Sequence, residues 1–454
     1  MKVLLLNPRS ERVKILRTEY MPPLGLMAIG AHLKHKCPDV YVEIVNAELI
    51  PEIETIELIE RSNPDILGIT TTVGCYRSAL EIAKIIKIFN NNIIIVLGGP
   101  YASVMWKECL DNRSYIDYCV IGDGQYPMEQ LCQKVSPNEI KGIASRDLQG
   151  TPSINEPVII ELDNYPDPDW SLIDSQAYQE GYNKVYGNSD AIYATISSQS
   201  GCKWRISTGM GCIFCGLVRP SYRTRSPERV WTEIKNLNDT YGCNHFWEVS
   251  DTICSSKEWL QEFHRLRPIN NDFYFRGYAR ASEITEIMAN YLKEVGYNEI
   301  FIGIESGDNN ILRNTNKGSS DIVNLRATKI LHNAGIKTFA SLVLGLPGES
   351  IKSLETTYRH VINLFENGLN TLSVCIFAPY PGSRAFDMIK NRPELSDKYY
   401  NQDTFDWPNF SKEWVQYFCE CSFQDIVNIS DKFNELPNSF YEDNFSYIDK
   451  VYNI

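Results

Sequence analysis

The sequence contains no uncharged apolar stretch that approaches the ~18 residues of a membrane-spanning helix. Its first residues, MKVLLLNPRS, lack the apolar core and the cleavage site of a secretory signal, because Asn, Pro and charge follow the short apolar run at once. Positive charge is also scarce: 44 Lys and Arg stand against 57 Asp and Glu, so the net charge is −13. We therefore expect a cytoplasmic protein that binds neither a membrane nor a nucleic acid.

The 454 residues are too many for one ordinary domain, and residues 1–150 form the first expected unit. Apolar β-branched runs alternate there with helical patterns, which predicts an open doubly wound parallel sheet. Ligands of such sheets bind beyond the carboxyl ends of the strands. Small or turn-forming residues gather at three successive strand ends, and they indicate a ligand site: Thr70, Thr71, Thr72, Gly98, Gly99, Pro100 and Gly122.

The remaining chain divides into three parts. Residues 151–190 are rich in Pro and Asp and predict an irregular linker. Residues 191–385 contain six strand candidates, and a helical pattern follows each of the first five, so we expect a partial (β/α)6 barrel with its site at the carboxyl ends of the strands. Residues 386–454 are irregular and aromatic, which predicts a small helical cap. The basic run 219–229, RPSYRTRSPER, could hold an anionic small molecule.

Three cysteines follow the first barrel strand: Cys202, Cys212 and Cys215. A reducing compartment disfavours a disulfide between them. A structural zinc site normally has four ligands, and Cys243 or His245 could supply the fourth, although both lie beyond a predicted helix. An iron–sulfur cluster held by only three cysteines leaves one iron open to a substrate or cofactor. The spacing of the cysteines leaves both metal alternatives open.

The cysteine loop, with an aromatic residue before its last cysteine, resembles that of the radical S-adenosylmethionine (SAM) enzymes. GIESG at 303–307, LGLPGES at 344–350 and PYPGS at 379–383 are similar to later motifs of that superfamily. In the first domain, MPPLGLMAIGAHL, VLGGPYAS and VIGDGQ are similar to the cobalamin-binding domain that one large branch of the superfamily carries. The resemblance covers roughly residues 1–385.

The resemblance implies three cofactors. Cys202, Cys212 and Cys215 would hold a [4Fe-4S] cluster whose open iron binds SAM. The following residues would contact SAM, with Phe214 near its adenine: Phe214, Ser250, Asp251, Arg280, Glu305 and Ser306. The seven residues at the strand ends of the first domain would hold cobalamin, without a histidine ligand because the sequence lacks Asp-x-His-x-x-Gly.

The chain departs from the family in the spacer between its first two cysteines. The family usually has a much shorter segment than KWRISTGMG, which occupies 203–211 here. Lengthening a loop costs little free energy, since threefold growth adds only ~1 kcal/mol of closure entropy. Ser207, Thr208, Gly209 and Gly211 let the segment fold back. The insertion therefore suggests an altered pocket for SAM or substrate.

The activity that the resemblance implies begins with an electron from an external donor such as flavodoxin or ferredoxin. The reduced cluster would cleave SAM, the 5′-deoxyadenosyl radical would take hydrogen from an unactivated carbon of a small metabolite, and cobalamin would supply a methyl group. A radical rearrangement or dehydration without methyl transfer, with the cobalamin domain as a scaffold, is one alternative. A non-enzymatic corrin- or nucleotide-binding module with a structural zinc site is the other.

Overall fold

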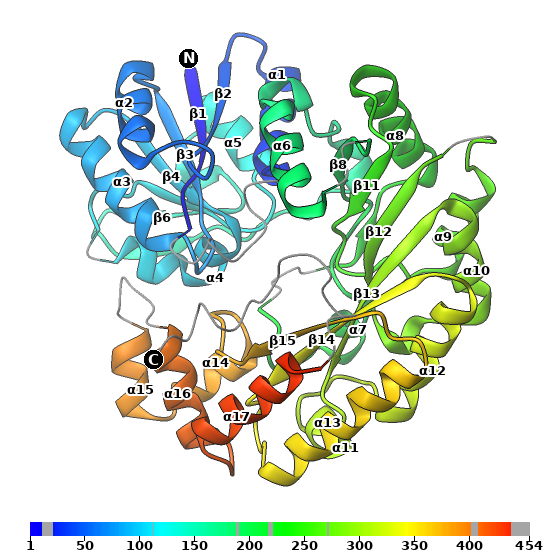
Figure 1. Ribbon diagram of the computed structural model, residues 1–454. Coiled ribbons are helices and arrows are strands. Elements are labelled where there is room, and N and C mark those ends of the chain that lie inside the picture. Colours follow the sequence, from blue (N-terminus) through cyan, green and yellow to red (C-terminus); the bar gives the residue numbers. More distant parts are fainter. Residues whose placement is uncertain are drawn as a thin grey trace.

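The computed structural model describes residues 1–10, 21–111, 113–187, 190–216, 221–269, 272–400 and 407–436. Figure 1 shows two α/β units side by side, with a group of helices from the carboxyl-terminal part of the chain below the first unit. None of the helices in this described part is both long enough and apolar enough to span a bilayer.

The first unit is a seven-stranded sheet of order β2-β1-β3-β4-β5-β6-β7. The strands are β1 (Lys2–Asn7), β2 (Tyr41–Asn46), β3 (Ile66–Thr70), β4 (Ile94–Gly98), β5 (Tyr118–Val120), β6 (Ile143–Arg146) and β7 (Pro152–Ile154). The first five pair in parallel as the sequence predicts, whereas β6 and β7 are antiparallel. The expected doubly wound parallel sheet is confirmed, and β6 and β7 extend it in antiparallel pairing past the predicted boundary at residue 150.

Helices cover both faces of this sheet because its strands are apolar on both sides. Leu4 and Leu6 of β1 pack into a core shared with α2 (Glu52–Ser62), α3 (Tyr76–Phe89) and α4 (Gly99–Leu110). Val3 and Leu5 point the other way, toward α1 (Leu24–Lys36) and α5 (Gln125–Cys132). Helix α4 is missing from the sequence prediction, which treats Gly98-Gly99-Pro100 only as a turn. Proline suits the first turn of a helix, so these residues form both the turn after β4 and the beginning of α4.

The segment between the two units is more ordered than its composition predicts. Besides short 3-10 turns it contains helix α6 (Ser175–Tyr186), which Asp174 caps by accepting hydrogen bonds from the backbone N–H groups of Gln176 and Ala177. Tyr178 and Tyr182, one turn apart, bury the inner face of α6. The prediction of an irregular linker is therefore wrong for this part.

The second unit is a six-stranded parallel sheet of order β15-β14-β13-β12-β11-β8. Its strands are β8 (Tyr193–Ile196), β11 (His245–Glu248), β12 (Tyr274–Ala279), β13 (Tyr297–Glu305), β14 (Lys337–Leu344) and β15 (Thr371–Ile376). Its outer helices are α8 (Pro227–Tyr241), α9 (Lys257–Arg265), α10 (Glu286–Val295), α12 (Asp321–Asn333) and α13 (Ile351–Glu366), with the shorter α11 (Asn309–Asn314) before α12. The sequential strand order confirms the predicted partial (β/α)6 barrel.

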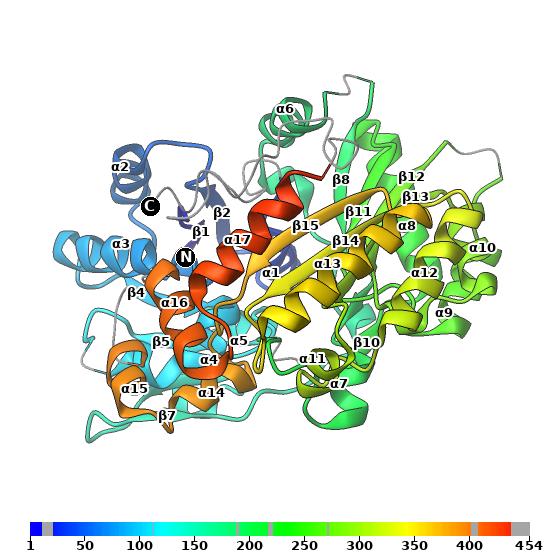
Figure 2. The same cartoon turned by 60° about the horizontal axis from the view of Figure 1, so that its bottom comes forward.

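Helices α14 (Arg384–Ile389), α15 (Pro393–Tyr399), α16 (Trp407–Phe418) and α17 (Phe423–Asn434) follow the barrel. Figure 2 shows α17 beside β15 and α13. Phe410 and Trp414 are fully buried, and the Trp414 indole N–H donates to the carbonyl of Gly345 at 2.9 Å. The predicted aromatic cap is thus present as far as the structure describes it, to residue 436.

Candidate functional site

The three cysteines lie on a loop that leaves the carboxyl end of the first barrel strand. Cys202 directly precedes the short helix α7 (Lys203–Thr208), and its thiol makes no capping hydrogen bond. Gly209 and Gly211 then adopt the left-handed conformation, which turns the chain back. Cys212 and Cys215 lie in the next turn, where the Cys215 N–H donates to the Cys212 carbonyl at 3.1 Å. The long spacer therefore folds into a helix and a turn, with the cysteines outside the helix.

The barrel anchors this cysteine loop, residues 201–216, through backbone contacts. The Ile213 N–H donates to the Thr315 carbonyl at 2.9 Å, and the Ile213 carbonyl accepts from the Ala385 N–H at 3.0 Å. The side-chain amide of Asn316 donates to the Gly211 carbonyl at 2.8 Å. The loop is therefore fixed by the segments that follow the fourth and sixth barrel strands.

Arg280, at the end of β12, binds the cysteine loop directly. Its guanidinium donates to the Cys212 sulfur at 3.7 Å and to the Lys317 carbonyl, and it lies 5.2 Å from the centre of the Trp204 ring. Arg280 therefore links the cysteine loop to the segment after the fourth barrel strand. Sequence reasoning placed Arg280 at SAM, and in this structure its contacts are with the cysteine loop and with the Lys317 carbonyl.

A buried ion pair lies next to Phe214 of the loop. The Lys317 ammonium is 2.7 Å from a Glu305 carboxylate oxygen and 5.8 Å from the centre of the Phe214 ring. Gly303 makes room for the pair, since a Cβ there would lie 2.2 Å from Glu305 Oε1 and 2.8 Å from Lys317 Nζ. Glu305 itself has a φ of 58°, which is unusual for a residue other than glycine. Sequence reasoning missed Lys317, because a lysine in a polar loop is normally exposed.

Three further residues were expected to contact SAM. In this structure their side chains accept hydrogen bonds from backbone N–H groups at the strand ends. The Ser250 hydroxyl accepts from the N–H groups of Ser198 and Gln199, and a carboxylate oxygen of Asp251 accepts from the Gly201 N–H at 2.7 Å. The hydroxyl of Ser306 is buried, 3.0 Å from that of Thr357. These contacts position the chain on either side of the cysteine loop.

The donor set bears on the two metal alternatives. In the described part of the chain, no three His, Cys, Asp or Glu side chains are close enough together to share one metal ion. Burial raises the pKa of Cys243 to about 12, and this thiol faces the Tyr193 carbonyl, so it remains a protonated core residue. His245, the other candidate for a fourth zinc ligand, stacks on Tyr274 and lies 2.8 Å from the side-chain oxygen of Asn244. A four-iron cluster suits the cysteines better, because each thiolate binds a different iron.

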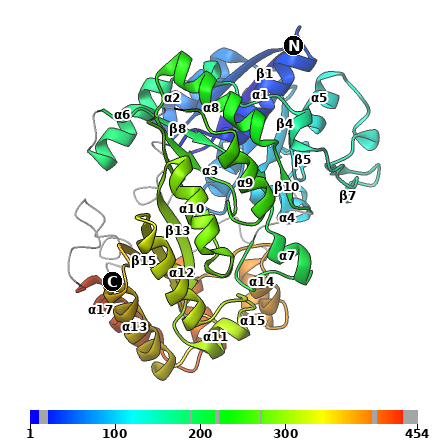
Figure 3. The same cartoon turned by 90° about the vertical axis from the view of Figure 1, so that its right-hand side faces the viewer.

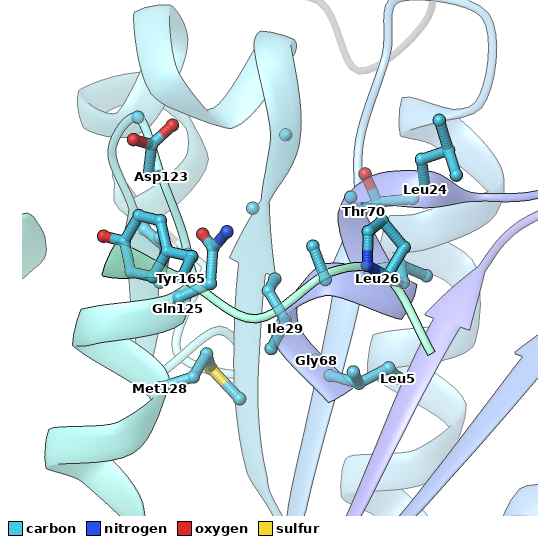
Figure 4. A pocket seen from close by; sticks show the side chains of 18 of the residues that line it. Leu5, Leu24, Leu26, Ile29, Gly68, Thr70, Asp123, Gln125, Met128 and Tyr165 are labelled. Atoms are coloured by element: carbon cyan, nitrogen blue, oxygen red, sulfur yellow. The ribbon is translucent and has the colours of Figure 1, made fainter. Parts of the chain in front are cut away.

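A cavity of about 430 Å³ opens at the carboxyl ends of the strands of the first unit. Figure 4 shows Leu5, Gly68, Ile29 and Met128 at its inner end and Thr70, Asp123, Gln125 and Tyr165 around it. Its wall also includes Ser197, Ser200 and Val249 of the barrel. Ser200 lies two residues before Cys202, so the cavity reaches the beginning of the cysteine loop.

Glycines let the walls of this cavity pack closely on one another. A Cβ on Gly68 would lie 2.9 Å from Leu5 Cδ2, and one on Gly124 would lie 2.6 Å from Ile29 Cδ1. Gly99 has a φ of 87°, and a Cβ there would meet the Thr71 carbonyl at 2.7 Å. The lining of the cavity is therefore packed too closely at these three positions to accept a side chain without a shift.

Five of the seven residues predicted to hold cobalamin line this cavity: Thr70, Gly98, Gly99, Pro100 and Gly122. Thr71 and Thr72 do not line it. The Thr71 hydroxyl is used inside the domain, where it donates to the Gly98 carbonyl at 2.6 Å and accepts from the Ala102 N–H. The Thr72 hydroxyl lies 3.3 Å from the Cys75 sulfur. The sequence reasoning missed the apolar inner wall that α1 and α5 contribute to the cavity. Ile29 and Met128 nevertheless lie in segments for which the sequence predicts helices.

The basic run after the cysteines binds acidic residues of the linker and the first domain. Arg223 donates to Asp123 at 2.7 Å, and Arg225 pairs with Asp167 at 2.7 Å and with Glu233 at 2.5 Å. Arg229 also pairs with Asp167. The expectation that this run holds an anionic small molecule is therefore not met at these three arginines, because protein carboxylates already occupy them. Arg219 lies outside the described residues.

Comparison with known proteins gives two family matches. The model of the B12 binding domain matches residues 13–132, and the model of the radical SAM superfamily matches residues 196–361. An uncharacterized methyltransferase of Pyrococcus horikoshii is 26% identical over 418 residues, which covers 89% of this chain and 87% of that protein. The anaerobic magnesium-protoporphyrin IX monomethyl ester cyclase of Rubrivivax gelatinosus is 25% identical over 415 residues, which covers 87% of this chain and 71% of that protein.

Two solved structures share the fold over most of the chain. The radical SAM methyltransferase TsrM of Kitasatospora setae, solved with cobalamin and a [4Fe-4S] cluster bound, has a TM-score of 0.68 at 17% identity. That match covers 84% of this chain and 76% of TsrM. The cobalamin-dependent radical SAM enzyme OxsB has a TM-score of 0.67 at 18% identity, with coverage of 96% of this chain and 62% of OxsB.

Proposed function

The chain belongs to the radical SAM superfamily and carries a B12-binding domain, and we propose that it is a cobalamin-dependent methylase of an unactivated carbon in a small molecule. The observation that carries this proposal is the position of the cavity. Its wall combines the strand ends of the B12-binding domain with Ser197 and Ser200 of the barrel, immediately before Cys202. A methyl carrier in the cavity and a radical generated at the cysteine loop would therefore act in one shared chamber.

Cys202, Cys212 and Cys215 would hold the [4Fe-4S] cluster. Arg280 donates to the Cys212 sulfur and, through the Lys317 carbonyl, fixes the segment that carries the buried ammonium. Glu305 and Lys317 form a buried ion pair beside Phe214, and these two charges would complement the amino and carboxylate groups of SAM. Ser250, Asp251 and Ser306 would keep the surrounding backbone in place.

Cobalamin would bind in the cavity, with its nucleotide tail among the apolar side chains at the inner end. When bound, these cofactors supply homolytic cleavage of SAM, hydrogen abstraction from carbon and delivery of a methyl group. The protein's own residues orient them and exclude water. The linker segment 162–168 covers one side of the cavity, and Arg225 holds it there through Asp167.

A second candidate function is a radical reaction without methyl transfer. The similarity to the magnesium-protoporphyrin ester cyclase, which is comparable in extent to that of the methyltransferase relative, favours it. Both candidates require an external one-electron donor, and both need reduced thiols, which favours the cytoplasm.

The products of SAM separate these candidates before a substrate is known. The chain is reconstituted anaerobically with iron, sulfide and cobalamin, then supplied with SAM and a reductant. A methylase should yield both 5′-deoxyadenosine and S-adenosylhomocysteine, because the methyl group and the radical come from separate SAM molecules. 5′-Deoxyadenosine alone would support the second candidate. In Cys215→Ala, 5′-deoxyadenosine should disappear, and continued formation of it would contradict the cluster assignment.

A further inference from the structure

The long spacer between the first two cysteines, residues 203–211, has no role in the site described above. Its first part forms helix α7, which Figure 3 shows at the rim of the molecule. None of the side chains of α7 is fully buried, so the filling of an apolar core does not explain the helix. Its contacts with the barrel run through Trp204, which is half-buried.

The Trp204 ring is fixed on the segment that follows α11. Its indole N–H donates to the Asn316 carbonyl at 2.8 Å. The ring also packs on Gly318, which has a φ of 66° and where a Cβ would overlap the ring. A residue other than glycine does not fit at position 318 without a shift of the tryptophan. A hydrogen bond and close packing therefore hold the ring in one place.

The guanidinium of Arg280 lies between this ring and a cluster cysteine. Its centre is 5.2 Å from the centre of the Trp204 ring, which is within the range of a cation–π interaction. It donates to the Cys212 sulfur at 3.7 Å and to the Lys317 carbonyl. Arg280 is buried, and within the described residues it forms no ion pair with a carboxylate. Its positive charge therefore acts on the Cys212 sulfur without an acidic partner from this part of the chain.

We infer that Trp204 is a positioning residue that holds the Arg280 guanidinium against the Cys212 sulfur, and that this contact raises the reduction potential of the cluster. The inference rests on the proposed function, since it requires the cluster. When the oxidised cluster takes up one electron, it gains one negative charge, and no bond forms or breaks. A cation that donates to one of its sulfurs stabilises that charge, because net charge and hydrogen bonds to sulfur set the potentials of such clusters. The long spacer therefore makes the cluster easier to reduce.

The test measures how easily the cluster of the reconstituted holoenzyme is reduced in the absence of SAM. Titanium(III) citrate, which is oxidised by one electron per titanium, poises the sample at the potential where half of the wild-type cluster is reduced. Electron paramagnetic resonance then counts the reduced cluster. In Arg280→Gln the ratio of reduced to oxidised cluster should fall at least about tenfold, which corresponds to about 59 mV for one electron.

Substitutions of Trp204 test its positioning role. Trp204→Leu should lower the same ratio at least about threefold, because the guanidinium keeps its charge but loses the ring that holds it. Trp204→Phe, which retains a ring, should recover most of that loss. Because Trp204 acts through Arg280, the ratio in Trp204→Leu/Arg280→Gln should equal that in Arg280→Gln alone.

Trp231 of α8 provides a matched control. Its indole N–H also donates to a backbone carbonyl, that of Phe263 at 2.8 Å, but its ring stacks on the Phe263 ring and not on an arginine. Trp231→Leu should therefore leave the ratio of reduced to oxidised cluster unchanged.

An unchanged ratio in Arg280→Gln or in Trp204→Leu would overturn the inference, as would an equal fall in Trp231→Leu or effects that multiply in the double variant. Loss of iron from Trp204→Leu would also overturn it, by showing that Trp204 only holds the loop together. Weaker binding of SAM by Trp204→Leu at an unchanged ratio would assign Arg280 to SAM instead of to the cluster. Absence of iron in the wild type would instead contradict the proposed function.

Discussion

The cavity of the first domain and the rim of the barrel are built on opposite principles. The cavity has a closely packed backbone lining at Gly68, Gly99 and Gly124, where a side chain does not fit, and its inner wall is apolar. The rim of the barrel is held by charged groups: Arg280 donates a hydrogen bond to the Cys212 sulfur, and Lys317 forms an ion pair with Glu305. Shape is thus fixed by backbone in one region and by ion pairs in the other. Disturbing one site should therefore leave the other intact, and this independence can be tested.

The largest effect is expected from filling the cavity. In Gly68→Leu the new Cβ lies 2.9 Å from Leu5 Cδ2, and the rest of the side chain must occupy the cavity or displace Met128. Overpacking of this kind costs about 1–3 kcal/mol, and the added atoms also remove space from the ligand. Cobalamin affinity should fall at least about a hundredfold. Gly68→Ala should give a smaller loss, and equilibrium binding measured by absorbance checks both.

Iron content is the control for that experiment. If the two regions are independent, Gly68→Leu should still bind a full complement of iron and sulfide after reconstitution. Normal cobalamin binding by Gly68→Leu would show that the cavity is not the cobalamin site, and loss of iron together with cobalamin would show that the two regions are coupled.

An intermediate effect is expected from breaking the buried ion pair of the barrel. Lys317→Met leaves the Glu305 carboxylate buried without its cation, which should lower the free energy of unfolding of the apo protein by about 3 kcal/mol. Lys317→Met/Glu305→Gln removes the unpaired charge and should recover most of that loss. Urea unfolding measures both variants, with cobalamin affinity as the control in the other region. If the single variant were as stable as wild type, the pair would not hold the rim together.

Repeating patterns allowed much of this architecture to be predicted from the sequence. The buried strands of both sheets are short β-branched runs, and their order follows from the alternation with helices, so the partial barrel is confirmed strand by strand. The glycines at strand ends were also informative: Gly98, Gly99 and Gly122 line the cavity, because turns at the carboxyl ends of parallel strands meet at one edge.

The rest depends on contacts between distant residues or on weak local signals. The β6–β7 hairpin consists of edge strands of only four and three residues, too short for a clear period. Helix α6 is hidden by its polar composition, although Tyr178 and Tyr182, one turn apart, were a usable signal. The partners of Arg223 and Arg225 come from the first domain, the linker and α8, so the sequence around the cysteines gave no means to find them.

The smallest effect concerns another buried acidic group of the barrel. Glu349 follows β14 and is almost completely buried, and this burial raises the pKa of its carboxyl group to about 7, although Ser353 donates a hydrogen bond to it. Because the folded state then holds a proton that the unfolded state releases near its ordinary pKa, this group stabilises the fold fully below about pH 4 and loses that effect as pH rises through about 7.

Glu349→Gln carries no ionisable proton, so its stability should depend less on pH than that of the wild type. Between about pH 5 and about pH 7.5, the wild type should lose about 2 kcal/mol more unfolding free energy than the variant. Urea unfolding of the apo proteins at the two pH values measures this difference, and cobalamin affinity, which depends on the glycine-lined cavity, should be the same in both proteins. A parallel pH dependence in wild type and variant would show that Glu349 is already ionised in the folded state, and the contrast between an apolar cavity and a charged barrel would not extend beyond the rim.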